Sequence, residues 1–184
     1  MVDITGHIAF GLLFALPAWY VYDDRASVGF VALAAVGALF PDIDLWLLKW
    51  FPVEVHHHGV THTVVFAVAA SLVGGAVVAG LLHRQVDDWV DGERFDARRL
   101  FVVATTALLT GMLSHVFADI LSAPDLSTSI EPFWPFFALP WSIDVLWYNA
   151  LWINYGFLTV MVVAHVVVAY LTTPADRRHR LNPL

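Results

Sequence analysis

The sequence predicts an all-α membrane protein, a polytopic bundle of about five transmembrane helices. Apolar residues make up 59% of the 184 residues, more than the polar surface of a water-soluble domain can cover. They gather in runs of about 20 residues, the length of helix that crosses a hydrocarbon core about 30 Å thick. Such spans leave no length for a separate soluble domain, so residues 1–184 are expected to form one unit. The chain has no cysteine, which excludes disulfides, thiolate nucleophiles and cysteine-ligated zinc.

The apolar runs place the expected helices in order along the chain. They cover residues 4–22, 27–48 with an interruption at Pro41, 61–82, 100–121 and 144–171. Pro41 lacks a backbone N–H and therefore breaks the hydrogen-bond ladder of its helix. No basic segment precedes the first run and no small-residue cleavage site follows it, so we expect a retained span rather than a signal peptide.

The two long connections differ in composition. Residues 83–99, HRQVDDWVDGERFDARR, are highly charged and are expected to form a solvated cytoplasmic loop. Residues 122–143 are rich in Pro, Trp and Phe and contain no charge run. We expect this segment to be an interfacial or re-entrant loop at the outer face, or to fold back over the bundle, because Trp is favoured at headgroup depth.

The basic residues predict the orientation in the membrane. With five spans, Lys49 falls at the end of the bundle that holds the N-terminus, and every arginine falls at the other end. The arginines are Arg25, Arg84, Arg94, Arg98, Arg99, Arg177, Arg178 and Arg180. The positive-inside rule then puts the N-terminus outside and the C-terminus in the cytoplasm of a cell membrane. Acidic residues balance the arginines at that end, so the net charge of −7 belongs to the outer end.

A set of ionisable side chains lies at the outer ends of the expected spans. Its members are His7, Asp42, Asp44, His57, His62, His115 and Asp119. Ionisable groups are costly inside a membrane, and several of these carboxylates have no basic partner at the same end. We therefore expect a divalent metal ion to neutralise them.

Spacing supports this metal site. His115 and Asp119 are four residues apart, so they project from one face of a helix. Asp42 and Asp44 are two apart and share no helix face, but the interruption at Pro41 lets both turn inward, and either is a candidate for a bridging carboxylate.

The segment HHGVTHT supplies the remaining imidazoles. His57 and His62 flank a turn at which Gly59 permits a tight reversal, while Thr61 or Thr63 is expected to cap the next helix or to hold an imidazole in place. Nitrogen and oxygen ligands suit zinc, manganese or iron, and their mix does not choose among these metals; zinc is the ion we expect first. The candidate ligands exceed one tetrahedral shell, so we expect one or two ions.

Simpler interpretations stand beside these. His83 and His165 are expected to be hydrogen-bonded structural residues. The pair His115 and Asp119 has the alternative of a buried hydrogen bond that pins two helices. Asp42 and Asp44 have the alternative of a helix end exposed among the headgroups. We expect the tryptophans around the loop to be interfacial anchors, and a wall for an acyl or isoprenoid chain is the second interpretation. They are Trp134, Trp141, Trp147 and Trp152.

The order of these motifs resembles the YdjM-like membrane-bound, metal-dependent hydrolases. That family has an early TH or TxH, a PDxD, an HRGxTHS and a late HxxxD, which here read TGHIAFG, FPDID, HHGVTHT and SHVFAD. The resemblance covers roughly residues 5–119 and has two departures. His58 stands where the family usually has arginine, and Gly6 separates Thr5 from His7.

The family is similar, more distantly, to zinc-dependent phospholipase C and P1-type nucleases. This likeness implies that the metal ligands are His7, Asp42 or Asp44, His62, His115 and Asp119. The soluble enzymes have a further histidine and a second His-x-x-x-acid pair, for which this chain offers only Glu131 and Asp144. A third metal is therefore not expected.

The resemblance implies a hydrolase that cleaves a phosphoester or phosphodiester of a lipid-like substrate at the outer membrane face. Its water would be activated by metal, with Asp42, Asp44 or Asp119 as bridge or base. The residues expected to bind substrate are His58, Thr61, Glu131 and Trp134. The partner is a membrane lipid or lipid-linked substrate, with no nucleic acid, and the oligomeric state is left open.

Two other classes of protein fit the same ligands. A divalent metal-ion binding or transport protein is the first, but transporters usually place ligands near the midplane between two repeated halves, a pattern that this sequence lacks. A scaffold with a degenerate site is the second, and it would bind no metal.

Overall fold

The computed structural model describes residues 2–50, 57–90, 95–126 and 128–174, and within them the architecture is all-α, as the sequence predicts. The helices are α1 (Ile4–Ala15), α2 (Ala18–Val21), α3 (Asp24–Leu39), α4 (Ile43–Trp50), α5 (Val64–Trp89), α6 (Ala97–Leu121) and α7 (Leu158–Thr172). A 3-10 turn, η1 (Val60–His62), precedes α5, and a π-helical turn, η2 (Trp152–Phe157), leads into α7.

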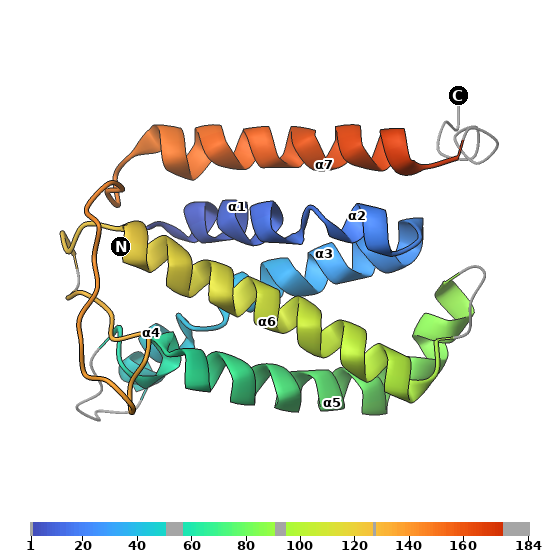
Figure 1. Ribbon diagram of the computed structural model, residues 1–184, viewed down its shortest axis with the longest axis horizontal. Helices are drawn as coiled ribbons and strands as arrows, with labels where there is room; N and C mark the ends of the chain where they lie inside the picture. The colour runs from blue at the N-terminus through green and yellow to red at the C-terminus, as the bar shows by residue number, and fades with distance from the viewer. Residues whose placement is uncertain (1, 51–56, 91–94, 127, 175–184) are drawn as a thin grey trace.

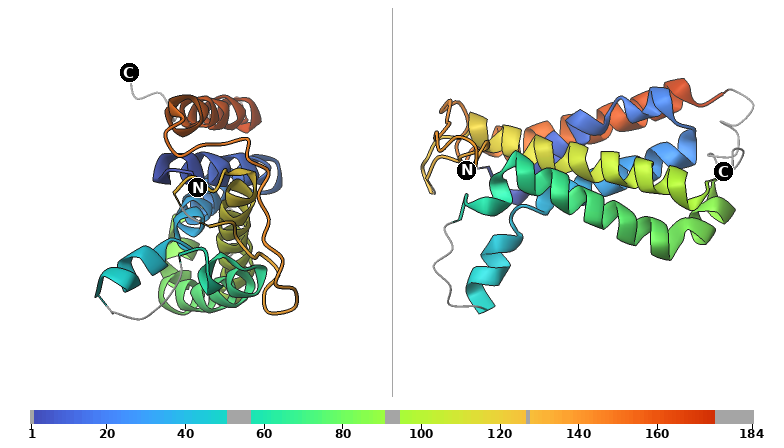
Figure 2. Two further views of the ribbon diagram at one scale, coloured as in Figure 1. Left: turned by 90° about the vertical axis from the view of Figure 1, so that its left-hand side faces the viewer. Right: turned by 60° about the horizontal axis from the view of Figure 1, so that its bottom comes forward.

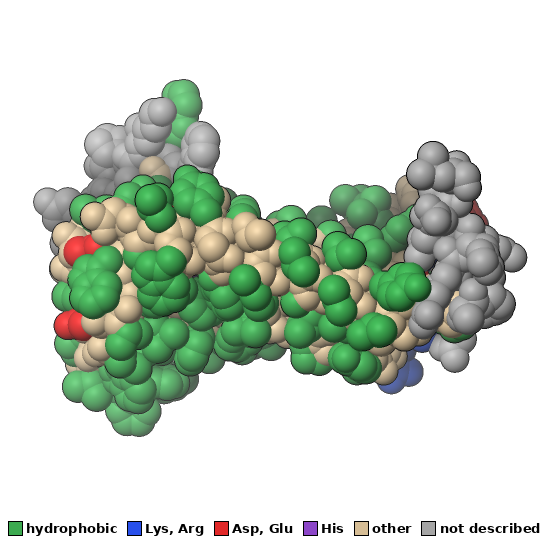
Figure 3. All heavy atoms as spheres, turned by 90° about the horizontal axis from the view of Figure 1, so that it is seen from above, with side chains coloured by type: hydrophobic (Ala, Val, Ile, Leu, Met, Phe, Trp, Pro, Cys, Tyr) green, Lys and Arg blue, Asp and Glu red, His purple; other side chains and the backbone are tan. Residues whose placement is uncertain are grey.

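The long helices run side by side along the longest axis of the molecule, whereas α4 leaves the bundle at an angle (Figures 1 and 2). Four segments are long and apolar enough to cross a membrane, namely Ile4–Val21, Val64–Trp89, Ala97–Leu121 and Trp152–Thr172. The 16-residue α3 packs between α1 and α6 and is about 24 Å long at 1.5 Å per residue. The flank seen in Figure 3 is largely apolar, and its visible charged side chains lie near the two ends.

The first span is broken at Pro17, and His165 compensates for the break. Because Pro17 has no N–H, the Leu16 N–H turns to the Leu13 carbonyl, and the Leu12 carbonyl loses its usual helical donor. His165 Nε2 lies 2.8 Å from this carbonyl and donates to it, while its Nδ1 accepts from Trp19 Nε1 at 2.7 Å. His165 is therefore structural, as expected, and it fastens α7 to the first span.

Two expected boundaries are wrong and one is confirmed. The expected loop at residues 83–99 is mostly helical, because α5 continues to Trp89 and α6 begins at Ala97; positions 91–94 lie outside the described residues. The interruption expected at Pro41 is confirmed, since the second expected helix is divided there into α3 and α4. The last one, expected from residue 144, begins only at η2, so the connection after α6 is longer than expected.

Polar contacts are found at the end of α5 and the start of α6. Asp96 accepts a hydrogen bond from the Arg99 N–H at 2.8 Å and so caps α6. Asp87 accepts from the Phe95 N–H at 2.6 Å, and Arg25 donates to the Trp89 carbonyl. Charged residues of this segment thus cap the start of α6 and connect the end of α5 with Phe95 and with α3.

The connection from α6 to η2 lies across one end of the bundle (Figure 1). The Ala123 N–H bonds to the Leu146 carbonyl at 2.7 Å, and the Val64 N–H bonds to the Pro132 carbonyl at 2.9 Å, which joins the loop to the start of α5. Phe136 and Phe137 are largely exposed on it. The loop therefore folds back over the bundle end, one of the expected arrangements.

Helices α3 and α6 approach closely through small residues. A Cβ on Gly111 would lie 2.0 Å from the Ala34 carbonyl oxygen, and a Cβ on Gly37 would lie 2.5 Å from the Leu108 oxygen. Small residues at such crossings are typical of membrane helices, where close packing replaces the hydrophobic effect as the source of association. This contact fixes the C-terminal half of α3 against the middle of α6.

We expect Gly111→Ala to lower stability in detergent by about 1–3 kcal/mol, because the added methyl group forces α3 and α6 apart. Gly80→Ala on α5 is the matched control: a Cβ there meets nothing within 4 Å, so the change is expected to be neutral or stabilising by about 1 kcal/mol at most. Unfolding midpoints of the two variants in the same detergent measure the difference. Equal midpoints would show that the α3–α6 contact is not tight.

Candidate metal centre

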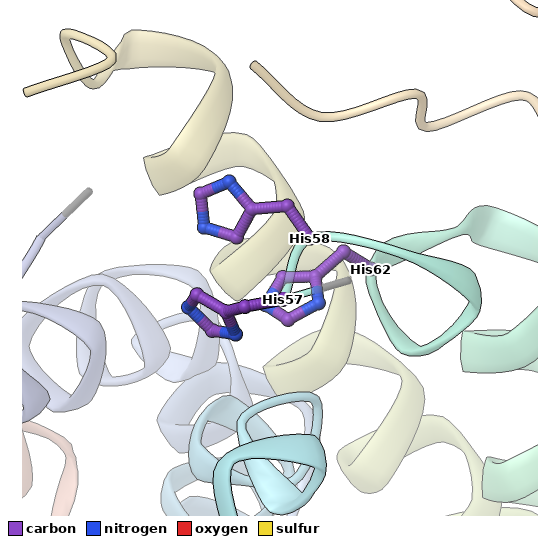
Figure 4. A group of neighbouring side chains, drawn as sticks. All are labelled: His57, His58 and His62. Carbon is purple, nitrogen blue, oxygen red and sulfur yellow. The ribbon is translucent and has the colours of Figure 1, made fainter. Parts of the chain in front are cut away.

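The candidate ligands come from five parts of the chain and meet at one end of the bundle. The parts are α1 with His7, the α3–α4 junction with Asp42, α4 with Asp44, the segment before α5 with His57, His58 and His62, and α6 with His115 and Asp119. Figure 4 shows the rings of His57, His58 and His62 gathered beside α6. The reversal expected at Gly59 begins one residue earlier, since His58 has φ 70°, in the left-handed region.

Buried polar atoms without a hydrogen-bond partner are concentrated in this cluster. Among the described residues, all but two of these atoms belong to it; the two exceptions are on Thr105 and Asn154. The cluster atoms are both ring nitrogens of His7, Nε2 of His57, His62 and His115, Oδ1 of Asp42, and both carboxylate oxygens of Asp119. Each unsatisfied buried polar group costs about 1–3 kcal/mol. One or two bound cations would satisfy most of them.

The distances between these atoms fit shared metal ligation. Asp42 Oδ1 lies 3.4 Å from His62 Nε2 and 3.6 Å from His115 Nε2. Asp119 Oδ2 lies 3.1 Å from His115 Nε2, and its Oδ1 lies 3.6 Å from His7 Nε2. Two ligand atoms at tetrahedral angles around zinc are about 3.3–3.5 Å apart, given bonds of about 2.0–2.1 Å.

The remaining imidazoles lie at the edge of this group. His57 Nε2 is 4.0 Å from Asp42 Oδ1, and His58 Nε2 is 3.8 Å from Asp119 Oδ2. The sets of donor atoms that lie close enough together to share an ion are His7–His115–Asp119, Asp42–His62–His115, Asp42–Asp44–His57 and His57–His58–His62. These overlapping sets offer more donors than one tetrahedral shell uses, and they are compatible with one or two ions.

Hydrogen bonds at Nδ1 orient most of the imidazoles toward the centre. His115 Nδ1–H donates to the Ala38 carbonyl at 2.7 Å, and His58 Nδ1–H donates to the Thr128 carbonyl at 2.5 Å. In each ring the Nε2 lone pair is then left for a metal. The alternative interpretation of His115, a buried hydrogen bond that pins two helices, is therefore also met. The bond joins Nδ1 to the Ala38 carbonyl and does not involve Asp119.

Asp44 acts on its neighbours more than on the centre. Its carboxylate lies 3.1 Å from His57 Nδ1 through either oxygen, and Thr61 donates to Oδ2 at 3.2 Å. Thr61 Oγ1 in turn lies 3.0 Å from His62 Nδ1 and accepts from that N–H. Thr61 therefore holds an imidazole, whereas Thr63 caps α5 by accepting from the Phe66 N–H at 3.1 Å. Each of the two expected roles, holding an imidazole and capping α5, is therefore filled by a different threonine.

The environment sets ionisation states that suit metal binding. Burial disfavours the charged form of Asp42, but the adjacent imidazoles of His62 and His115 hold its pKa at about 2. Burial lowers the pKa of His58 to about 4 and outweighs the attraction of Asp119. Near neutral pH, Asp42 is therefore a carboxylate and His58 a neutral imidazole.

A cavity of about 740 Å³ opens beside the cluster. Its walls include His57, His58, Glu131 and Trp134, so three of the four expected substrate-binding residues, all except Thr61, lie around one space. The carbonyls of Ala38 and Thr128, which orient two histidines, were not anticipated. No sequence signal marks them, because every residue carries a carbonyl.

The fold and the cluster define a class: a polytopic helical membrane protein with a buried histidine and aspartate centre that can hold metal at one end. Within this class, the model of the YdjM inner membrane protein family matches residues 1–179, so the chain belongs to that family. No curated protein matches the chain. No solved structure matches it either.

We expect His115→Ala to lower metal affinity strongly, because its ring belongs to two of the candidate ligand sets. The loss should exceed the roughly 10–100-fold that is typical when a residue that only orients a ligand is removed. His83→Ala is the matched control, since this ring bonds only to the Ala79 carbonyl one turn back on α5. Metal content of the purified protein, measured by elemental mass spectrometry after dialysis, separates the two. Full occupancy in His115→Ala would refute the assignment.

We expect Asp44→Asn to weaken metal binding by about 10–100-fold without abolishing it at saturating metal, because the amide orients His57 and Thr61 poorly. Titration of the metal-free protein with zinc measures the affinity. A complete loss of binding at any zinc concentration would instead make Asp44 a direct ligand.

Proposed function

We propose that the protein is a membrane-embedded, metal-dependent hydrolase that cleaves a phosphoester or phosphodiester of a lipid-like substrate. The observation that carries this proposal is the convergence of unpartnered nitrogen and carboxylate oxygen atoms beside a cavity. Membership of the YdjM inner membrane protein family supports a membrane location. The distant likeness of the motifs to zinc-dependent phospholipase C and P1-type nucleases supports phosphoester chemistry.

The residues divide into roles. His7, Asp42, His62, His115 and Asp119 would hold one or two divalent ions, zinc being the first choice. When bound, such an ion supplies Lewis acidity toward a phosphoryl oxygen and lowers the pKa of a water molecule. Asp42 and Asp119 are the carboxylates with unpartnered oxygens, so they are the candidates for accepting a proton or bridging two ions.

The cavity wall supplies the groups that would contact the substrate. His57 and His58 stand between the cluster and the cavity, where the phosphoryl group would be held. Neutral His58 at the position of the family arginine brings no fixed positive charge, and its Nδ1–H is already bonded to the Thr128 carbonyl. Glu131 and Trp134 lie on the loop that covers the bundle end, where they would contact the leaving group or the lipid.

We place the site on the extracytoplasmic side. Arg25, Arg84, Arg98 and Arg99 lie at the starts of α3 and α6 and near the end of α5, at the bundle end opposite the cluster. The positive-inside rule assigns that end to the cytoplasm. Arg94, Arg177, Arg178 and Arg180 lie outside the described residues.

We expect the purified protein to release phosphate from at least one phosphate-bearing lipid in a metal-dependent manner. Asp42→Asn should lower kcat by about 100-fold or more, because it removes a carboxylate whose oxygen lies between His62 and His115. Asp88→Asn, an exposed change at the opposite end of the bundle, is the control and should leave kcat unchanged. Chelation followed by zinc addition should remove and restore the activity.

The same preparation tests the transport alternative. If no lipid, nucleotide or simple ester is turned over while reconstituted vesicles show zinc flux that Asp42→Asn removes, the protein is a transporter and the hydrolase proposal is wrong. Bound metal without turnover or flux would leave a metal-binding scaffold.

A further inference from the structure

An apolar groove reaches the metal cluster from the side of the bundle. It has a volume of about 380 Å³ and is lined by Ile4, Val36, Leu39, Phe40, Asp42 and Ile43. Asp42 is its one charged member. The groove therefore joins a hydrocarbon-like surface to a carboxylate of the candidate metal centre.

The sequence explains why a groove forms at this place. Pro41 ends the regular part of α3, and the chain then turns so that α4 leaves the bundle, as both views in Figure 2 show. No helix continues along the line of α3, so the first turn of α1 and the last turn of α3 are left with an open side. Ile4 and Val36, on these two turns, are 59% and 55% exposed.

The groove and the larger cavity approach the cluster through different residues. The cavity ends on His57 and His58, whereas the groove ends on Asp42. Only 4.0 Å separates His57 Nε2 from Asp42 Oδ1, so the centre lies where the two spaces come closest. A ligand that reaches the centre from both spaces would be apolar at one end and polar at the other.

We infer that the groove holds one hydrocarbon chain of a phosphate-bearing membrane lipid, which enters sideways from the bilayer while its phosphate group lies at the cluster. The occupant follows from continuity with the metal centre and from the position of the groove on the bundle flank, where lipid chains are the surrounding solvent. This inference rests on the proposed function for its phosphate group and adds the entry route and the amphiphilic character of the substrate. A water-soluble phosphoester would have no use for the apolar half.

The test is photolabelling of the full-length, zinc-loaded protein in nanodiscs with phosphatidic acid that carries a diazirine in its acyl chain. Lipid chains touch every exposed flank, so the informative signal is the labelling that excess unlabelled phosphatidic acid removes and excess diacylglycerol does not. We expect that signal on the peptide that contains Val36 and Leu39. On the part of α3 around Val28 we expect only labelling that is insensitive to phosphatidic acid.

Two variants fill the groove from opposite walls. Val36→Trp and Ile4→Trp should each lower the phosphatidic acid-sensitive labelling by about fivefold or more, because an indole occupies the space of the chain. Val28→Trp is the matched control: Val28 is 48% exposed on the same helix, about 12 Å further along it, and does not line the groove. Retained zinc content shows that each variant is folded, and the two walls provide independent readings.

Equal labelling in all three variants, or equal competition by diacylglycerol, would overturn the inference. If the wild-type protein hydrolyses nothing yet shows the labelling pattern described, the proposed hydrolase function fails and the lipid groove remains. If the protein hydrolyses a lipid phosphate and Val36→Trp leaves its KM unchanged, the groove is wrong and the hydrolase stands.

Discussion

The close contact between α3 and α6 is the constraint on which the candidate metal centre depends. Gly37 and Gly111 let the two backbones approach, since a Cβ at either position would overlap carbonyl oxygen of the other helix. The Ala38 carbonyl then comes within 2.7 Å of His115 Nδ1. One hydrogen bond thus sets the distance between the helices and the tautomer of a ligand. The chain after α3, which carries Asp42, is brought to the same place.

Burial of these imidazoles and carboxylates without a cation costs folding free energy, because their polar atoms stay without partners. His7 and His115 stack with ring centroids 3.7 Å apart, and Nε2 of each ring lies within 3.6 Å of an Asp119 oxygen. Among the described residues, Asp42 Oδ1 and both oxygens of Asp119 have no hydrogen-bond partner. Stability gained by close packing elsewhere offsets this local cost, which is the usual relation between a binding site and its scaffold. These oxygens, with the unpartnered ring nitrogens, are the atoms that a bound divalent ion would satisfy.

The sequence predicts the all-α class, the broken helix at Pro41 and each histidine and aspartate of the cluster, because apolar runs and costly ionisable groups leave a clear pattern. It predicts the helix boundaries less well. Charged residues after Leu82 continue α5, since a helix that has left the apolar layer needs no apolar face. Apolar residues between Asp144 and Leu151 do not make a span, because they belong to the loop that covers the cluster. The carbonyls of Ala38 and Thr128 accept hydrogen bonds from histidines only because tertiary packing brings them together. The identity of these two residues does not predict that packing.

The break at Pro41 links the chemistry of the centre with access to it. A proline at the end of a span frees the chain to turn, which moves Asp42 toward His62 and sends α4 away from the bundle. An unbroken helix would cover the space between the first turn of α1 and the end of α3. It would also direct Asp42 and Asp44 to different faces, whereas here one has an oxygen in the centre and the other holds His57. The same residue therefore separates the roles of two neighbouring aspartates and opens the apolar groove on which Asp42 lies.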